Sequence, residues 1–158
     1  MAEVGVWMGK NAFALLSKRA DLTMWLIDRW TRPEEGDSYA ASGAEMAVKP
    51  QSRFDEAYHA AIQVAQKFSG RTHVVVDTTI HAATRFEDGF FDCVFIDADH
   101  SYAGCRADIL AWRSKVRPGG LLCGHDYANK AGEVKLAVDE IFPSGVFVGD
   151  DHTWFVRL

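Results

Sequence analysis

Several features that would define a class of protein are scarce or missing in this chain of 158 residues. The three cysteines, Cys93, Cys105 and Cys123, form neither a disulfide framework nor a paired zinc motif. No apolar run is long enough to span a bilayer, and no charged and apolar leader opens the chain. The net charge of −5 lacks the basic excess that a nucleic-acid surface needs. These absences predict a cytoplasmic protein that binds neither membranes nor nucleic acids.

Composition and element patterns indicate one α/β domain over residues 1–158. The apolar fraction of 48% and the charged fraction of 25% are ordinary for a globular domain. Strand and helix patterns alternate until the last segment, which reads as two antiparallel strands around a turn. We expect strands over residues 2–7, 22–27, 73–77, 93–97 and from 121, helices over 11–20, 53–68, 103–115 and 133–142, and the hairpin over 145–158. This pattern predicts a mostly parallel sheet with helices on both faces.

The segment over residues 31–52 breaks this alternation. It is polar, rich in small residues and bounded by Pro33 and Pro50. A loop of this length within a compact domain is usually either functional or disordered. We therefore expect residues 31–52 to form a mobile loop.

Acid and imidazole side chains follow two buried-strand patterns, CVFID and GLLCGHD. Asp97, Asp99 and His100 end the first pattern, and His125 and Asp126 end the second. Because the carboxyl ends of parallel strands open onto one crevice, we expect these five side chains to share a ligand site. Imidazole titrates near neutral pH and is a candidate general base, although a structural histidine bonded to the backbone is an equally good explanation for either ring.

The start of the chain carries a glycine-bearing strand-to-helix turn, EVGVWMG. Glycine permits close approach of the backbone to a ligand, while the acid Glu3 repels pyrophosphate and suits a cationic amine. Asp28 closes the second strand pattern 19 residues after Gly9, where a carboxylate can accept both hydroxyls of a ribose. An ordinary turn and a helix-capping aspartate are the alternatives, and the joint spacing favours a nucleoside ligand.

Taken together, these segments resemble the class I S-adenosylmethionine-dependent methyltransferases over essentially the whole chain. EVGVWMG is similar to the first motif of that family, and LIDRW resembles the acidic tip of its second strand. The FIDADHSY and GHDY motifs, the VRPGG turn and the closing HTWFVRL resemble a bacterial subgroup of small methyltransferases. The resemblance implies a Rossmann-like seven-stranded sheet of order 3-2-1-4-5-7-6 with strand seven antiparallel.

The resemblance also implies how S-adenosylmethionine is bound. Glu3 and the loop over residues 5–9 would hold the methionine end of the cofactor, and Asp28 would hold the ribose. Trp30 would either lie against the adenine or fill the core. The family's adenine-binding acid aligns with Thr78, because Asp77 comes one residue early. The implied cofactor-binding residues are Glu3, Gly5, Trp7, Gly9, Asp28, Trp30, Thr78, Thr79 and Asp97.

On the acceptor side, the implied catalytic residues are Asp97, His100, His125 and Asp126. Asp97 resembles the strand-four aspartate that binds a divalent metal in catechol-type O-methyltransferases, and Asp126 takes the position of a second metal aspartate. An asparagine that follows in those enzymes is Tyr127 here. Two carboxylates with water would suit Mg²⁺, which would lower the pKa of an acceptor hydroxyl. Helix capping and ion pairing are the alternative roles of both acids.

Members of the family usually carry helices before the first strand, whereas this sequence begins with that strand. The difference implies an open site, closure by residues 31–52, or a homo-oligomer in which another subunit covers the site. We expect methyl transfer to a small-molecule acceptor, at oxygen rather than at nitrogen.

Three other functions fit part of the sequence. A metal-dependent hydrolase would use the five acids and imidazoles at the strand tips, but it leaves EVGVWMG and Asp28 without a role. A nicotinamide dehydrogenase fits less well because the GxGxxG pattern is absent. A degenerate domain that binds cofactor without turnover stays open, given the short N-terminus and Thr78.

Overall fold

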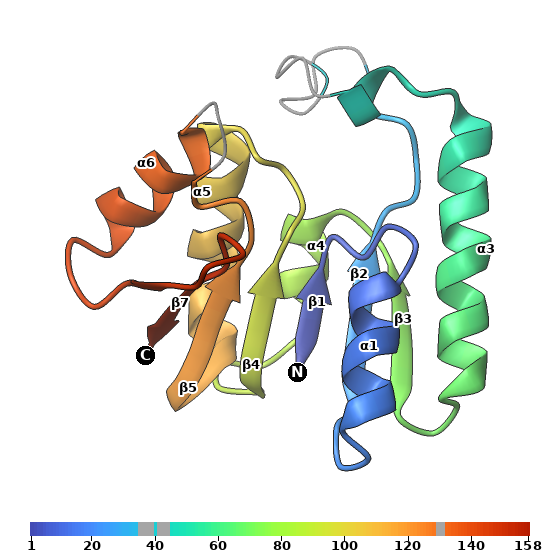
Figure 1. Cartoon of the computed structure of the whole chain (residues 1–158), viewed down its shortest axis with the longest axis horizontal. Helices are drawn as coiled ribbons and strands as arrows, with labels where there is room; N and C mark the ends of the chain where they lie inside the picture. Colours follow the sequence, from blue (N-terminus) through green and yellow to red (C-terminus); the bar gives the residue numbers. More distant parts are fainter. Residues whose placement is uncertain (35–39, 41–44, 129–131) are drawn as a thin grey trace.

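The computed structural model describes residues 1–34, 40, 45–128 and 132–158. In this part of the chain the strands are β1 (Ala2–Val4), β2 (Met24–Asp28), β3 (Thr72–Val76), β4 (Phe91–Ile96), β5 (Val116–Gly124), β6 (Phe147–Val148) and β7 (Trp154–Arg157). The helices are α1 (Lys10–Lys18), α3 (Gln51–Lys67), α4 (Thr79–Ala83), α5 (Tyr102–Trp112) and α6 (Glu133–Ile141), with short 3-10 helices η1 (Glu45–Val48) and η2 (Arg113–Lys115). Figure 1 shows the strands side by side with the N-terminus at the central strand β1. Among the described helices, none combines the length and apolarity that a membrane crossing requires.

The strands form one seven-stranded sheet in the order β3-β2-β1-β4-β5-β7-β6. β1 pairs in parallel with β2 and β4, and β7 runs antiparallel to β5 and β6. The predicted strand order and the antiparallel seventh strand are therefore confirmed. The turn predicted over residues 117–120 instead lies within β5, where the pairing jumps from Phe91 with Val116 to Cys93 with Leu121. These residues form an irregularity inside the strand.

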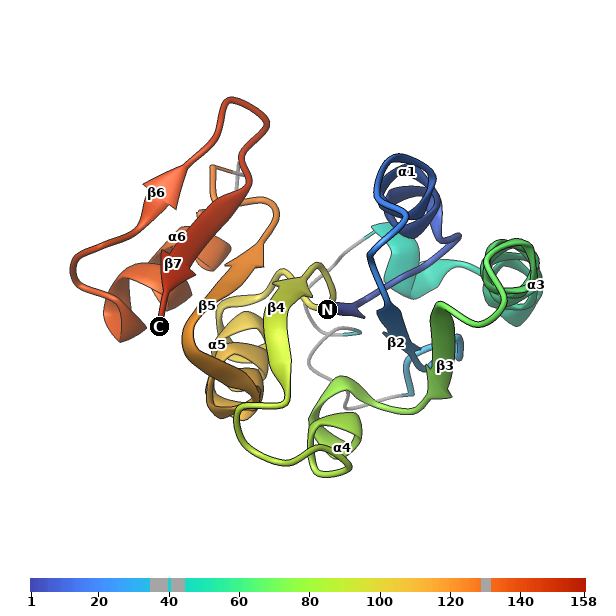
Figure 2. The ribbon, with the colours of Figure 1, turned by 90° about the horizontal axis from the view of Figure 1, so that it is seen from below.

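Alternate side chains of the strands enter two separate cores, one on each side of the sheet. In β2, Met24 and Leu26 belong to the core that includes α1 and α3, whereas Ile27 belongs to the core of the opposite face, which includes residues of α4, α5 and α6. Figure 2 shows these two groups of helices on either side of the strands. Helices on both faces are thus confirmed. The sequence pattern does not reveal α4, whose five residues are too few to show a helical period.

The carboxyl ends of β1, β2 and β4 bring three loops together at one edge of the sheet. The closest approach occurs at Gly5, where φ is +89° and an added Cβ would lie 2.2 Å from the carbonyl oxygen of Asp97. Gly9, at φ 73°, ends the turn in the left-handed conformation, and α1 begins at Lys10, one residue before the predicted range. The loop after β1 is therefore pressed directly against the end of β4.

Only part of the segment over residues 31–52 is described. Within it, η1 occupies Glu45–Val48 and α3 begins at Gln51. The prediction of a mobile loop falls mainly on residues 35–39 and 41–44, which lie outside the described residues. It stays a prediction.

Candidate functional site

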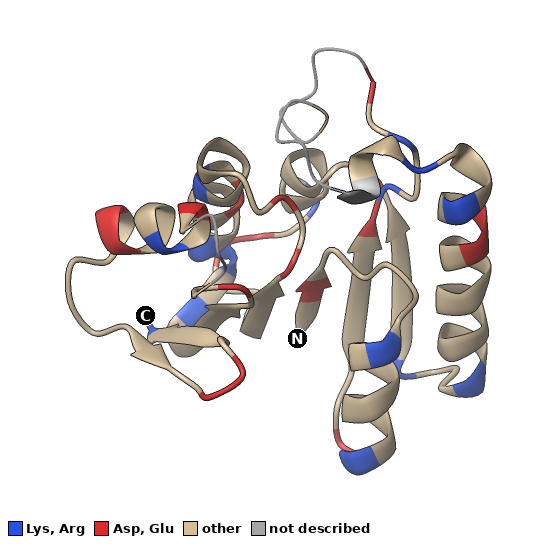
Figure 3. Cartoon of the chain, turned by 45° about the horizontal axis from the view of Figure 1, so that its top comes forward, with Lys and Arg blue, Asp and Glu red and all other residues tan. Residues whose placement is uncertain are grey.

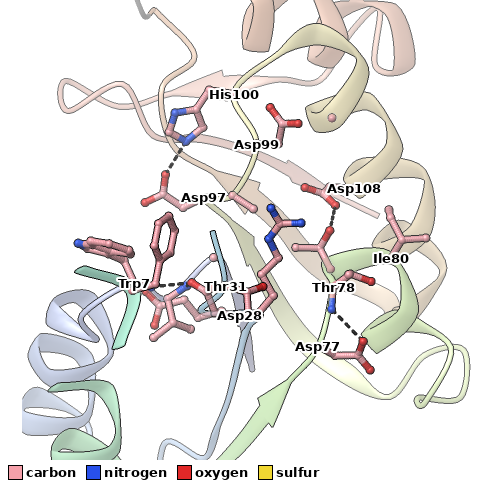
Figure 4. A pocket seen from close by; sticks show the side chains of 18 of the residues that line it. Trp7, Asp28, Thr31, Asp77, Thr78, Ile80, Asp97, Asp99, His100 and Asp108 are labelled. Atoms are coloured by element: carbon pink, nitrogen blue, oxygen red, sulfur yellow. Dashed lines mark hydrogen bonds and ion pairs between the residues drawn. The ribbon is translucent and has the colours of Figure 1, made fainter. Parts of the chain in front are cut away.

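A cavity of about 700 Å³ lies at the carboxyl edge of the sheet. Its walls come from the loop after β1, the ends of β2, β3 and β4, and one face of α5, as Figure 4 shows from close by. In Figure 3, acidic segments lie at the ends of β1 and β2 and directly after β4, around the same edge. The volume is typical of small-molecule sites, and the walls carry several carboxyl groups.

Glu3 on β1 lines the cavity and is only 2% exposed. The Nδ2 group of Asn11 donates a hydrogen bond to Glu3 Oε1 at 3.1 Å, while Oε2 is buried without a partner among the described residues. Burial raises the pKa of Glu3 to about 8, despite the opposing effect of the hydrogen bond from Asn11. An unpartnered buried acceptor is costly, so the wall of the cavity at Glu3 fits a ligand that brings a cationic donor to Oε2.

Asp28, the last residue of β2, joins two loops of the cavity. Its Oδ2 accepts hydrogen bonds from the backbone amides of Val6 at 3.0 Å and Trp7 at 2.8 Å, and its Oδ1 accepts one from the amide of Trp30 at 3.0 Å. Trp7 and Trp30 have φ values of 51° and 46°, which are rare for bulky residues. The carboxylate therefore stabilises two strained turns, and Oδ1 keeps one acceptor position for a ligand hydroxyl. Capture of a second hydroxyl would have to displace a backbone amide.

Trp7 lines the cavity, but two other residues of the predicted cofactor site do not. Trp30 is 3% exposed and packs in the core, where its Nε1 donates to the carbonyl oxygen of Trp7 at 2.8 Å. Gly9 faces α3, and an added Cβ would lie 3.3 Å from Val64. Of the two roles considered for Trp30, the structure shows core packing, because the indole is already enclosed and hydrogen-bonded. Gly9 shapes the turn and lets α1 approach α3.

The loop after β3 forms part of the far wall of the cavity, and Thr78 and Thr79 both line it. Thr78 caps α4 by accepting a hydrogen bond from the amide of His81. The carboxylate of Asp77 accepts from the amide of Thr78 at 2.8 Å, contacts His81 Nδ1 at 2.7 Å and pairs with Arg85. Figure 4 shows this carboxylate directed away from the cavity. Asp77 is thus occupied by its own loop and helix.

Asp108 on α5 also lines the cavity, and it is not among the site residues predicted from the sequence. It is 2% exposed, and Thr79 Oγ1 donates a hydrogen bond to its Oδ1 at 2.5 Å. Burial raises the pKa of Asp108 to about 7, against the effect of the hydrogen bond from Thr79. One signal in the sequence could have identified this residue. Asp108 lies three residues after Cys105 and four before Trp112, so it falls on the same buried face of α5.

His100 lies between two carboxylates at the ends of β4 and β5. Its Nε2 is 3.1 Å from Asp97 Oδ1, and its Nδ1 is 3.2 Å from Asp126 Oδ2. Burial disfavours the charged ring, but the neighbouring carboxylates of Asp97 and Asp126 outweigh this effect and raise the pKa of His100. Both ring nitrogens therefore face carboxylate oxygens, an arrangement that favours the charged form of the ring. Asp99, which also lines the cavity, accepts a hydrogen bond from the amide of Ser101 at 2.9 Å.

Asp126 and its neighbour His125 lie outside the lining of the cavity. His125 Nδ1 is 3.5 Å from Asp126 Oδ2. Asp97, His100 and Asp126 each offer one ligand atom, and these atoms lie within 4.8 Å of one another. Tyr127 turns its hydroxyl to Asp139 Oδ1 at 2.6 Å and does not join them. The structure therefore brings the predicted strand-tip residues together, with His100 between the two predicted metal ligands.

Comparison with known proteins places this geometry in a family. Residues 2–127 match the family model described as a methyltransferase domain. No curated protein matches the chain. Among solved structures, the calicheamicin methyltransferase CalS11 is similar at 13% identity with a TM-score of 0.69, over 99% of this chain and 71% of the other. The O-methyltransferase NovP is similar at 19% identity with a TM-score of 0.66, over 99% and 70%.

The same fold extends to spermidine synthase from Thermotoga maritima, at 14% identity and a TM-score of 0.59. That match covers 99% of this chain but only 52% of the synthase, so the chain spans about half of that protein. Identities this low show a shared fold, and the class of chemistry comes from the family match. These comparisons give no support to the hydrolase hypothesis. The chain therefore belongs to the methyltransferase domain family, with the fold of the class I S-adenosylmethionine-dependent methyltransferases.

Proposed function

We propose that this chain transfers the methyl group of S-adenosylmethionine to a hydroxyl group of a small-molecule acceptor. One observation carries the proposal: the cavity and the acid–imidazole cluster share residues. Asp97 and His100 line the cavity and also belong to the acid–imidazole cluster with Asp126. Methyl transfer needs donor and acceptor to meet in line at one point, and this overlap supplies such a point.

Glu3 and Asp28 would hold the cofactor. The buried Oε2 of Glu3 suits the ammonium group of the methionine part, and the remaining acceptor position of Asp28 suits a ribose hydroxyl. The bound cofactor supplies an electrophilic methyl group on a sulfonium centre. The chain contributes a fixed partner for each polar end, and the bonds from Asp28 to Val6 and Trp7 keep the wall between them in place.

The proton of the acceptor hydroxyl needs a base, and we assign this role to His125. Both ring nitrogens of His100 face carboxylate oxygens, so neither is placed to take the proton of an acceptor hydroxyl. Asp126 faces Nδ1 of His125, which favours the tautomer that leaves Nε2 as the acceptor. The positive charge of His100 would stabilise an oxyanion that forms nearby.

A divalent cation such as Mg²⁺ is a second way to activate the hydroxyl. Asp97, His100 and Asp126 offer their ligand atoms close together, which favours this candidate. Mg²⁺ prefers oxygen ligands, and one of the three groups is an imidazole, so the donor set suits it only in part. Activity that is lost with EDTA and restored by Mg²⁺ would establish the metal; activity unchanged by EDTA would assign the chemistry to the side chains.

Calorimetric titration with S-adenosylhomocysteine in the absence of metal tests the proposed function. We expect binding and, when S-adenosylmethionine is supplied as the methyl donor, methylation of at least one hydroxyl compound in a panel of phenols, catechols, sugars and matched amines. Binding without methylation of any compound would identify a degenerate domain. Tight metal binding without cofactor binding would revive the hydrolase, and transfer to amines alone would contradict the hydroxyl assignment.

Replacing Asp126 by asparagine should lower kcat about 100-fold and leave the Kd of S-adenosylhomocysteine within about twofold. Asparagine tolerates the φ of 60° at this position, so the backbone is kept, but a neutral amide no longer balances His100 or orients His125. Steady-state kinetics and calorimetry measure the two effects separately. Asp88→Asn is the matched control, because Asp88 precedes β4 and pairs with Lys115 away from the site. Full kcat in Asp126→Asn would remove the cluster from the mechanism.

A further inference from the structure

Trp7 holds a large ring in the wall of the cavity in a backbone conformation that makes this costly. It lies between Gly5 and Gly9 in the turn after β1, and its φ of 51° is one that bulky residues rarely adopt. Such a conformation persists only where neighbouring groups hold it, and it is common at ligand sites. Glycine adopts it without steric cost, so the indole itself needs an explanation.

The structure fixes Trp7 through its backbone and through its ring. The amide donates to Asp28 Oδ2 at 2.8 Å, and the carbonyl oxygen accepts a hydrogen bond from Trp30 Nε1 at 2.8 Å. The indole meets the ring of Phe54 edge to face, with ring centroids 5.4 Å apart and planes at 88°. Phe54 also lines the cavity and is 6% exposed. These two residues, the aromatic pair, therefore form a rigid apolar part of the wall.

Trp7 lies on the side of the cavity where we expect the acceptor. Figure 4 shows it on the same side as Asp97 and His100, with Asp108 on the other side. The turn that carries Trp7 is also pressed against the end of β4, because an added Cβ at Gly5 would lie 2.2 Å from the carbonyl oxygen of Asp97. An acceptor whose hydroxyl reaches Asp97 and His100 can thus place its carbon skeleton against the indole.

We propose that the aromatic pair of Trp7 and Phe54 selects an acceptor in which a planar aromatic ring carries the hydroxyl group. The substrate class is then phenols and catechols, in preference to sugars and aliphatic alcohols. This inference rests on the proposed methyl transfer. Aromatic rings favour offset-stacked or edge-to-face contacts with one another, and these contacts stabilise a complex beyond the burial of apolar area. A saturated ring of similar size gains the burial alone.

The acidity of the acceptor hydroxyl supports the same class. A phenolic hydroxyl has a pKa of about 10, as in the side chain of tyrosine, whereas the hydroxyls of sugars and aliphatic alcohols are far weaker acids. The base that we assign is the imidazole of His125. Proton transfer to a side chain is more efficient when the two pKa values lie closer together, so an imidazole suits a phenol better than an aliphatic alcohol.

Calorimetry with a matched pair of probes tests this inference on the protein saturated with S-adenosylhomocysteine. Catechol is compared with cis-cyclohexane-1,2-diol, which carries the same two hydroxyls on a saturated ring, and EDTA is present so that a metal cannot chelate either probe. We expect the wild-type protein to bind catechol about tenfold more tightly than the diol. Trp7→Gly should lower this preference to less than about twofold, and Phe54→Leu, which keeps an apolar side chain, should lower it to about threefold.

The Kd of S-adenosylhomocysteine, measured on the same variants, separates the acceptor role from a cofactor role. Trp7→Gly keeps the amide that Asp28 binds and relieves the backbone strain, so this Kd should stay within about threefold of the wild-type value. Trp25→Phe is the matched control, because Trp25 contacts Phe91 and lies outside the lining of the cavity. This variant should keep both the preference and the Kd.

Several results would overturn the assignment. They are a catechol preference that survives in Trp7→Gly, a preference that disappears in Trp25→Phe, and a Trp7→Gly protein that loses affinity for S-adenosylhomocysteine while it keeps the preference. If the wild-type protein binds S-adenosylhomocysteine but does not prefer catechol, the proposed methyl transfer stands and only the aromatic acceptor is lost. If it does not bind S-adenosylhomocysteine, the proposed function itself fails and the role of the aromatic pair falls with it.

Discussion

Replacing Glu3 by glutamine is expected to weaken the binding of S-adenosylhomocysteine about 100-fold at pH 8.5. The wild-type carboxylate offers the buried Oε2 to the ligand's ammonium group as a charge-assisted hydrogen bond, and glutamine offers a neutral amide in the same place. Charge-assisted bonds are roughly twice as strong as neutral ones, and loss of the buried charge pair adds to the effect. Calorimetry at fixed salt measures the change in Kd.

The pH dependence of binding gives a sharper form of this prediction. With the pKa of Glu3 raised to about 8, the free protein holds a neutral Glu3 below that value, while an ammonium ligand requires the ionised form. Binding below pH 8 therefore releases a proton, and wild-type affinity should rise about ninefold from pH 6 to pH 7 and about fivefold from pH 7 to pH 8. Proton release appears in calorimetry as a dependence of the binding enthalpy on the ionisation enthalpy of the buffer.

Matched variants separate this effect from general changes in charge. Glu3→Gln cannot titrate and should bind with almost no slope over pH 6–8. Glu133→Gln removes an acid that instead accepts the backbone amide of Tyr102, and it should keep the wild-type slope. A Glu3→Gln protein that retains both the affinity and the slope would show that Glu3 does not meet the ligand's amine.

The same titration affects the stability of the ligand-free protein in the opposite direction. The folded-state pKa of Glu3 lies above its unfolded value near 4.5, so the native state binds the proton more tightly than the unfolded chain. Its contribution to the free energy of unfolding is fully present below pH 4.5 and is lost as the pH rises through about 8. The ligand's ammonium group should restore that stability at high pH. Glu3 thus trades stability of the empty site for affinity.

The sheet could be predicted from the sequence because its signals are strong and local. The apolar runs that end at Asp28, Asp97 and Asp126 mark parallel strands, and strand ends at one edge must share a crevice. The strand order and the antiparallel β7 were accordingly confirmed. The prediction of a turn over residues 117–120 was wrong because glycine and proline occur at strand irregularities as well as in loops.

The parts of the site that the sequence leaves open depend on side-chain direction. Nothing local in the sequence tells whether Trp30 faces the cavity or the core, and the structure places its indole under the loop that contains Trp7. Asp77 and Asp108 show the same limit: the acid one residue before the aligned position turns toward Arg85, and an acid within a helix turns inward to Thr79. Packing between distant elements decides these directions.

Replacing Gly5 by alanine is expected to destabilise the fold strongly and to open the contact between the loops after β1 and β4. A Cβ at Gly5 would lie 2.2 Å from the carbonyl oxygen of Asp97, and its neighbours are backbone atoms that cannot rotate away. Relative to an alanine at an open position with similar φ, we expect about 4 kcal/mol less stability. For a domain of this size that difference lowers Tm by about 8–16 °C, which thermal unfolding followed by circular dichroism measures.

Gly70 supplies the matched control, because its φ of +85° nearly equals the +89° of Gly5 while nothing lies within 4 Å of its added Cβ. Gly70→Ala bears only the strain of a left-handed alanine, about 1–2 kcal/mol. Any excess in Gly5→Ala is therefore due to the crowding against Asp97 rather than to backbone conformation. Because relief of the crowding must move Asp97, Gly5→Ala should also lose affinity for S-adenosylhomocysteine, whereas Gly70→Ala should keep it. Equal Tm values for the two variants would contradict the close approach of β1 and β4 on which the geometry of the whole site depends.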